Sequence, residues 1–214
     1  MYQPPLFKED DLQVQHALIR AHPLGLLITA PAGGPTANVY PFHLDAGRSQ
    51  KGTLLAHMAK ANGQWQELKE GAPALVVFQG PESYITPSWY ATKQETGKVV
   101  PTWNYAMVQV HGKVTVMEGA DWLHAHVSAL TDEHETGRAD AWAVSDAPES
   151  YIQSQIKGIV GLEIEVTEIE GKWKVSQNRP AADRDRVAES LGTSGEPLHN
   201  AAMAELVRHY GAKR

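Results

Sequence analysis

A long alternating segment constrains the fold of this chain most strongly. From Tyr105 to Glu118 the sequence YAMVQVHGKVTVME places apolar and polar residues in turn, with Gly112 near its middle. Alternation with a period of two is typical of a half-buried β-strand, and a glycine inside it indicates a bend. We therefore expect a long, bent strand of an antiparallel sheet.

Shorter segments around this strand also have the composition of β-structure. The PAGGP turn separates GLLITA from TANVYPFHLD, so these two are expected to pair, with Pro41 at an edge or a bulge. Residues 159–179 are expected to form a closing hairpin that turns at Glu170 and Gly171. Short turns between strands favour an antiparallel barrel with helices over a doubly wound sheet. The strands predicted in the first part of the chain cover residues 25–30 and 36–45, which are the two segments above, and residues 52–58 and 73–80.

Helices are predicted by capping residues and by apolar periodicity. Asp10 and Gln13 resemble a capping box at the start of the first helix, and Pro23 ends it. Asn62 is the predicted N-cap of a helix that Gly71 closes, so a strand-to-helix turn falls on HMAKAN. The predicted helices cover residues 10–22, 62–71, 121–135, 146–157, 181–192 and 197–210.

The composition argues against several function classes. The net charge of -6 repels nucleic acid unless a local basic patch opposes it, and no such patch stands out in the sequence. With no cysteine, the chain has no disulfides, thiolate chemistry, iron–sulfur clusters or Cys-type zinc sites. The start MYQPPLFKEDD lacks the features of a signal peptide, and no apolar run approaches the roughly 20 residues of a membrane span. We expect a cytoplasmic protein with no membrane association.

Aromatic residues cluster beside glycine, proline and small polar residues rather than in apolar runs. The segments concerned are HMAKANGQW, FQGPESYITPSWY and VPTWNY. Aromatic rings offer flat faces, and the polar groups beside them offer hydrogen bonds along the edge of a planar heterocycle. This mixture predicts a nucleotide-type cofactor site. A pair of aromatic loops closing one end of a barrel is the alternative interpretation of the last two segments.

Lys60 stands at the predicted strand-to-helix turn and is the candidate ligand of a terminal phosphate. Asn62 follows where helix N-terminal amides would converge, and His57 adds a possible donor. A cation beside such amides favours an anion. A solvated lysine before a helix explains the same residues without a ligand.

Metal and hydrolase sites have little support in the sequence. His124 and His126 are two residues apart and so lie on different faces of a predicted helix, and no HExxH motif is present. Ser176 and His111 lack the GxSxG turn that would support a catalytic triad, and GxGxxG and GxxxxGK[ST] motifs are also absent. We expect no metal site and assign no catalytic residue.

Several motifs occur in the order found in a known family. They are PLGLLIT with PFHLD, HMAKANGQW, FQGPESYITPSWY, VPTWNY, the DAP before Tyr151, and IVGLEIEVTEIEGKWKVSQNR. From the N-terminal helix to about Arg186 the chain resembles the PaiB family, the FMN-binding negative transcriptional regulators. The resemblance implies a mainly β fold with helices, an antiparallel split β-barrel related to pyridoxamine-phosphate-oxidase-like flavoproteins. It also implies a homodimer with FMN at the subunit interface.

The same resemblance implies positions for the flavin. Residues 1–180 would form the FMN-binding domain, with residues 181–214 as a helical extension packed on it. The isoalloxazine ring would lie along β-strand residues, the phosphate would lie at the turn that follows the next strand, and a third segment, from this chain or its partner, would complete the pocket. The implied residues are Asn38, Val39 and Tyr40 for the ring, His57, Met58, Ala59, Lys60 and Asn62 for the phosphate end, and Thr102, Trp103 and Asn104 for the third segment.

The chain departs from the family pattern at a few positions. Lys60 replaces an arginine, Gly63 a proline, and Thr86 a serine. Lysine keeps the charge but loses the bidentate fork, so phosphate affinity is expected to be lower, and Gly63 loosens the first helical turn.

Different functions remain open on this sequence. One is a flavin-binding regulator with DNA as a partner, although the acidic charge and the lack of a helix-turn-helix give no account of DNA binding. Another is a flavin-dependent oxidoreductase that uses NAD(P)H or oxygen as redox partner. A haem-handling protein on the same fold is a third interpretation, motivated by 10 histidines.

Overall fold

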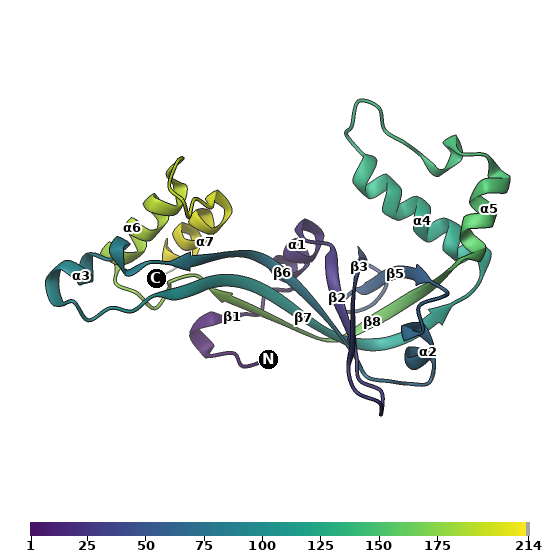
Figure 1. The fold of residues 1–214 in the computed structure, drawn as a ribbon, viewed down its shortest axis with the longest axis horizontal. Helices are drawn as coiled ribbons and strands as arrows, with labels where there is room; N and C mark the ends of the chain where they lie inside the picture. The colour runs from purple at the N-terminus through teal and green to yellow at the C-terminus, as the bar shows by residue number, and fades with distance from the viewer. Residues whose placement is uncertain (213–214) are drawn as a thin grey trace. The chain divides into compact units, whose positions relative to one another are not determined.

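A computed structural model describes residues 1–212 and shows a mixed β and α architecture around an eight-stranded sheet (Figure 1). The strand order is β3-β2-β6-β7-β8-β5-β4, and β1 pairs with β8. The strands are β1 (Lys8–Glu9), β2 (Leu24–Thr29), β3 (Thr36–Pro41), β4 (His43–Asp45), β5 (Thr53–Ala59), β6 (Ala74–Ile85), β7 (Thr102–Met117) and β8 (Ile159–Lys174). The α-helices are α1 (Leu12–Ala21), α2 (Gln64–Lys69), α3 (Ala91–Thr96), α4 (Ala120–Glu135), α5 (Glu149–Lys157), α6 (Ala181–Gly192) and α7 (Ala201–Ala212), with 3-10 turns η1 (Pro5–Phe7), η2 (Pro87–Trp89) and η3 (Val144–Asp146).

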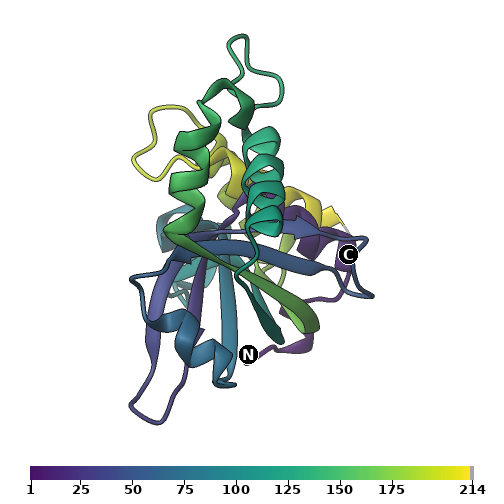
Figure 2. The same ribbon diagram turned by 90° about the vertical axis from the view of Figure 1, so that its right-hand side faces the viewer.

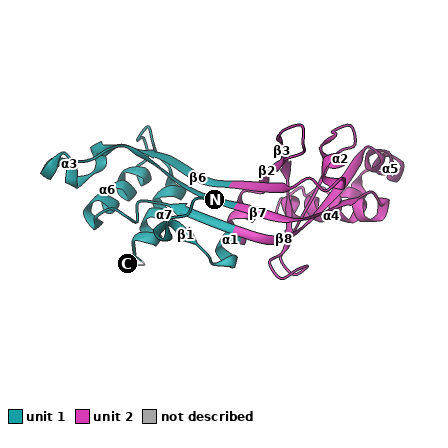
Figure 3. Cartoon of the chain, turned by 90° about the horizontal axis from the view of Figure 1, so that it is seen from below, with its two compact units in different colours: residues 1–15, 79–108, 170–214 teal, residues 16–78, 109–169 magenta. Residues whose placement is uncertain are grey.

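The chain divides into two compact units, which Figure 3 shows in different colours. Unit 1 comprises residues 1–15, 79–108 and 170–214, and unit 2 comprises residues 16–78 and 109–169. The long strands β6, β7 and β8 each contribute one part to unit 1 and the other part to unit 2.

Unit 2 is built from two antiparallel strand sets. Strand β2 pairs with β3 and with β6, so that Leu26 lies opposite both Val39 and Val77. Strand β5 pairs with β4 and with β8. Side chains on the inner face of these strands are buried, and Gly25 is required there because a Cβ would lie 2.7 Å from the ring of Phe78.

A helical pair inserted between β7 and β8 covers part of unit 2. Figure 2 shows α4 and α5 side by side, and a cluster of buried apolar residues joins them. Trp122 of α4 lies so close to β8 that a Cβ on Gly161 would be 2.0 Å from its ring. The cluster consists of Leu123, Val144, Ile152 and Ile156.

Unit 1 places α6 and α7 beside the ends of the long strands. Asp183 of α6 is buried at 1% exposure, and its carboxylate accepts hydrogen bonds from the backbone N–H and the hydroxyl of Thr92. The side-chain amide of Asn200 donates to the carbonyl of Glu82 at 2.8 Å. The C-terminal helices are thus fixed to β6 and α3 within this unit.

The predicted class, mainly β with helices in an antiparallel arrangement, is confirmed, and so is the long strand around Gly112. A Cβ at Gly112 would lie 2.5 Å from the carbonyl oxygen of Glu165, so this glycine marks a close approach of β7 and β8. The predicted strand 36–45 is divided between β3 and β4, just after Pro41. The last two residues of the expected extension, 213–214, lie outside the described residues.

The predicted hairpin at Glu170 and Gly171 is wrong. Strand β8 continues without a turn from Ile159 to Lys174, and Gly171 pairs with Glu9 of β1. A Cβ at position 171 would lie 2.8 Å from the carbonyl oxygen of Glu9. The glycine therefore permits a close strand contact, which the sequence pattern alone does not distinguish from a turn.

Some predicted helix starts are displaced by one or a few residues. Gly63, not Asn62, is the N-cap of α2, although the side-chain oxygen of Asn62 accepts from the Gln64 amide at 3.0 Å. Asp11 caps α1 by accepting from the amide of Gln13 at 2.8 Å. The last helix begins at Ala201 because Asn200 caps it through the Met203 amide.

Candidate functional site

Strand β3 and the turn after β5 come together in unit 2. Strand β3 stands at the end of the sheet order, so one edge of its backbone has no strand partner among the described residues. The hydroxyl of Tyr40 on β3 accepts a hydrogen bond from the side-chain amide of Asn62 at 2.8 Å. The two segments assigned to the cofactor site, residues 38–40 of β3 and the turn that contains Asn62, are therefore in direct contact.

A buried glutamine links these segments. The side chain of Gln64 is 1% exposed, and its Oε1 accepts from Asn38 Nδ2 at 3.1 Å and from the Tyr40 hydroxyl at 2.9 Å. Its Nε2 donates to the Leu27 carbonyl and the Thr29 hydroxyl, both at 3.2 Å. Since both ends of the amide have partners, Gln64 sets the positions of Asn38 and Tyr40 relative to the turn.

The environment keeps Tyr40 protonated. Burial raises the pKa of its hydroxyl, and the hydrogen bond from Asn62 lowers it by a smaller amount. The neutral hydroxyl donates to Gln64 and accepts from Asn62 at the same time. Asn38 and Tyr40 thus face α2, whereas Val39 between them lies on the opposite face of β3 and is 57% exposed.

The turn of residues 59–63 presents groups that suit an anion. Lys60 is exposed, and no ion pair within the described chain includes its ammonium group. The amides of Lys60 and Asn62 donate to the carbonyls of Gly158 and Ala59, which fixes the turn. The amides of Ala61 and Gly63 make no backbone hydrogen bond within residues 1–212. An ammonium group and free amides on an exposed turn fit a phosphate group.

The remaining predicted residues of this segment face elsewhere. His57 directs its ring at α4, where its Nδ1 lies 3.1 Å from Nε2 of His126. Met58 is 3% exposed and belongs to the core, whereas Ala59 is exposed at the start of the turn. Burial lowers the pKa of His57, so its ring is neutral at pH 7 and adds no positive charge to the turn.

Thr102, Trp103 and Asn104 lie on β7 in unit 1 and alternate between its two faces. Trp103 is 54% exposed, and its neighbour Asn104 is 1% exposed. The side-chain amide of Asn104 donates to the hydroxyl of Ser176 at 2.9 Å, so it is already occupied within the chain. Lys174 donates to the Thr102 hydroxyl and to the Trp103 carbonyl, both at 2.5 Å.

Sequence reasoning missed Gln64 and Lys174. Gln64 follows Asn62 within the HMAKANGQW motif, but its partners on β2 and β3 are distant in sequence. Lys174 lies in the KWKVSQNR motif, and this motif predicts only that the residue belongs to a strand. Neither residue has a local pattern that would have identified its contacts.

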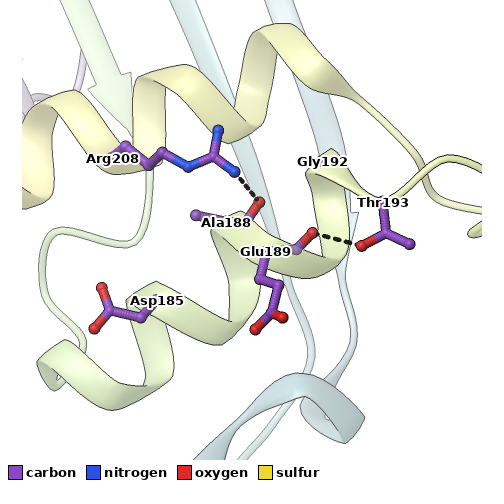
Figure 4. Close-up of a pocket in the computed structure, with 6 residues that line it drawn as sticks. All are labelled: Asp185, Ala188, Glu189, Gly192, Thr193 and Arg208. Carbon is purple, nitrogen blue, oxygen red and sulfur yellow. Dashed lines mark hydrogen bonds between the residues drawn. The ribbon is translucent and has the colours of Figure 1, made fainter.

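A separate cavity of about 380 Å³ lies between α6 and α7 in unit 1 (Figure 4). Arg208 donates to the Ala188 carbonyl at 3.1 Å, and Figure 4 shows the carboxylates of Asp185 and Glu189 turned away from its guanidinium. No predicted site residue lines this cavity.

Comparison with known proteins decides the family. Residues 1–168 match the family described as "Putative FMN-binding domain". Protease synthase and sporulation protein PAI 2 of Bacillus subtilis is 32% identical, over 97% of this chain and 96% of its own length. The chain belongs to the PaiB family. A further relative of this PaiB-family chain, an uncharacterised protein of Emericella nidulans, is 36% identical over 99% of the chain and 98% of its own length.

The fold of the PaiB-family chain also occurs among solved structures. The FAD and haem binding protein from Mycobacterium smegmatis superposes with a TM-score of 0.58 at 18% identity, over 78% of this chain and 73% of that one. At this identity the similarity shows the fold and not the ligand.

The helices and the acidic and histidine side chains of the PaiB-family chain bear on membranes and metals. Within residues 1–212, no helix combines the length and the apolar character needed to cross a bilayer. Over the same residues, no group of three or more His, Asp or Glu side chains is arranged to hold a metal ion.

Proposed function

We propose that this chain binds FMN in unit 2, with the phosphate at the turn of residues 59–63 and the ring beside the free edge of β3. The observation that carries this proposal is the exposed turn itself, where Lys60 and the amides of Ala61 and Gly63 are available to an anion. Membership of a family described as FMN-binding supports the choice of ligand.

The residues beside the turn fit the rest of a flavin. The unpaired edge of β3 offers backbone N–H and C=O groups, which match the donors and acceptors along the edge of an isoalloxazine ring. Gln64 fixes this edge relative to the turn through Asn38 and Tyr40. When bound, the flavin would supply electron-transfer chemistry that no side chain of this site provides.

Titration with FMN and riboflavin tests this assignment. Wild-type protein is expected to shift the flavin absorption bands, and Lys60→Gln is expected to weaken FMN binding roughly tenfold or more, because a charge-assisted hydrogen bond is lost. Riboflavin, which has no phosphate, should bind both proteins equally. Lys60→Arg should bind FMN at least as tightly as the wild type, since a guanidinium forms a bidentate contact. Equal FMN affinity in all three proteins would reject the phosphate site.

The homodimer is proposed from an apolar face of unit 2. Leu26, Val39 and Val77 are neighbours across three strands, and none of them is buried. Leu24, Ile28, Pro41 and Leu75 extend the same face. An exposed apolar patch of this kind marks an interface, and a second copy of the chain would cover it. We place the third flavin segment, Thr102 to Asn104, in the partner subunit.

Light scattering tests the dimer. Val39→Asp should convert a dimer into a monomer, whereas Ala37→Asp, on the rim of the same strand, should have a smaller effect. A wild-type monomer at micromolar concentration would exclude the dimer, and with it the interface position of the flavin.

The domain arrangement and the regulatory role are also proposals. Residues 1–180 would form the flavin domain, with the extension fixed to it by contacts such as that of Asn200 with Glu82.

The regulatory role implied by the family is tested by adding promoter DNA at low salt, where failure to bind would reject direct repression. A cytoplasmic location stays a prediction.

A flavin-dependent oxidoreductase is the second candidate. It is favoured by the solvent exposure of the turn of residues 59–63, which would leave that end of a bound flavin open to small molecules. The fold is shared with a FAD and haem binding protein of Mycobacterium smegmatis. Anaerobic bleaching of bound FMN by NADH or NADPH, with recovery on admitting oxygen, would support this function, and an inert flavin would reject it.

A further inference from the structure

A polar cleft of about 230 Å³ opens on unit 2, where strands β5, β7 and β8 lie beside the loop that precedes β5. Two cations, two carboxylates and three hydroxyl side chains line it, and the lining includes no purely apolar side chain. Such a lining offers little apolar surface, so an occupant would be held by charge and by hydrogen bonds. None of the residues assigned above to the flavin lines this cleft.

Strand pairing places most of these groups on one face of the sheet. Glu163 and Glu165 are two residues apart on β8 and therefore point to the same side. Thr53 of β5 pairs directly with Glu165, so its hydroxyl lies on that side as well. Lys113 and Thr115 are also two residues apart on β7, which is the neighbour of β8 at its other edge. Regular strands, not a flexible loop, therefore set the spacing of these groups.

One ion pair of the cleft is already complete. Glu163 Oε1 accepts a hydrogen bond from the indole N–H of Trp122 at 2.5 Å and another from Arg48 Nη2, and the Glu163 side chain is 18% exposed. The indole of α4 and the guanidinium thus fix this carboxylate and neutralise its charge. The Nε and Nη1 groups of Arg48 donate no hydrogen bond within residues 1–212. Arg48 therefore keeps donors for a second carboxylate.

The other two charges of the cleft have no ionic partner among the described residues. Lys113 and Glu165 are both exposed, and none of the ion pairs formed by residues 1–212 includes either of them. They therefore do not neutralise one another, although both line the same cleft. With two cations and two carboxylates, the lining has no net charge. A ligand with a single sign of charge would meet like charges here, whereas a ligand with both signs would find a partner for each.

We propose that the polar cleft binds a small zwitterion of the amino-acid type, with its carboxylate between Lys113 and the open side of Arg48 and its ammonium group at Glu165. Charge-assisted hydrogen bonds at both ends would orient such a ligand. Its size is limited, because about 230 Å³ lies below the roughly 300–1,000 Å³ of pockets for drug-sized molecules. The cleft shares no residue with the turn of residues 59–63 or with β3, so this inference does not depend on the flavin proposal.

Nuclear magnetic resonance titration of the full chain with each of the common amino acids tests the cleft. At least one amino acid is expected to bind with a dissociation constant on the order of 1 mM or below, as two charge-assisted contacts allow. Its methyl ester, which lacks the carboxylate, and its N-acetyl derivative, which lacks the ammonium group, should each bind roughly fivefold or more weakly. Lys113→Gln should weaken binding of the amino acid but not of its ester, and Glu165→Gln should weaken binding of the amino acid but not of its N-acetyl derivative.

Two exposed side chains of unit 2 provide matched controls. Glu168→Gln, on β8 but on the opposite face from Glu165, and Lys157→Gln, on α5, should both bind the amino acid as the wild type does. FMN binding should be equal in the wild type, Lys113→Gln and Glu165→Gln, so failure of this inference leaves the flavin proposal untouched. The inference is overturned if no amino acid binds, if the two derivatives bind as tightly as their parent, or if the two cleft variants bind as the controls do. Weaker FMN binding in both cleft variants would also overturn it, because the cleft would then belong to the flavin site.

Discussion

The histidine pair between β5 and α4 predicts a loss of stability at acidic pH. His126 is 3% exposed, its ring is stacked on Trp122 with 5.1 Å between centres, and its Nε2 lies 3.1 Å from Nδ1 of His57. Its Nδ1 is buried and has no hydrogen-bond partner among residues 1–212. Charging this ring in place is unfavourable, because burial and the nearby His57 and His43 lower its pKa from 6.5 to about 4.

The sign and size of the effect follow from this pKa. Between about pH 6.5 and 4 the unfolded chain binds a proton at His126 and the native chain does not, so stability falls as the pH falls through this window. The lowered pKa of His126 corresponds to a change of about 3 kcal/mol in the free energy of unfolding once the pH is below both values. Roughly 2 kcal/mol of this stability is lost between pH 7 and 5. Burial lowers the pKa of His57 as well, which acts in the same direction. His43 faces the pair while bonded to Glu133 at 2.6 Å.

Urea unfolding at pH 5 to 8 measures the effect, with His126→Gln as the comparison. Glutamine is neutral at every pH and can still hydrogen-bond His57. The wild type should lose roughly 2 kcal/mol more than this variant between pH 8 and 5. His134→Gln, at an exposed histidine of the same helix, should follow the wild type. Parallel pH profiles for wild type and His126→Gln would show that His126 does not titrate with a lowered pKa, and would refute the reasoning.

Other substitutions test the packing and the polar contacts. Gly161→Ala should destabilise the protein by about 1–3 kcal/mol in thermal melts, because the new Cβ would meet Trp122; an unchanged melting temperature would contradict the contact. Gln64→Leu should cost about 2–4 kcal/mol in urea unfolding and also weaken FMN binding, while Gln66→Leu, on the exposed side of α2, should do neither. Asp183→Asn should lower stability by about 1–3 kcal/mol, since its buried carboxylate would lose charge-assisted bonds, and an equal free energy of unfolding would count against that role.

The sequence predicted most strands because their signal is local. Alternation identified β7, whereas Gly112, predicted as a kink, also permits the close approach of β8, which only the folded chain shows. Gly171 shows where this reasoning fails, because a glycine that admits a neighbouring strand has the same sequence signature as one that makes a turn. The helix starts at Asn62 and Asp10 were displaced because several adjacent residues can cap a helix and tertiary contacts select one of them.

The candidate site was predictable only in part. Lys60 could be found from the strand-to-helix turn around it, and the structure shows it exposed there. The orientation of His57 toward α4 and the role of Gln64 depend on contacts with residues far away in the sequence. The KWKVSQNR motif predicted only a strand, because the contacts of Lys174 with Thr102 and Trp103 form only in the folded chain.

Calorimetric titration of wild type and Lys60→Gln with FMN and with riboflavin tests the central claim most directly. The proposed site predicts that the wild type binds FMN more tightly than riboflavin, and that Lys60→Gln removes most of this difference by weakening FMN binding roughly tenfold or more. An FMN affinity that is the same in both proteins, or no greater than the riboflavin affinity of the wild type, would contradict a phosphate site at the turn of residues 59–63.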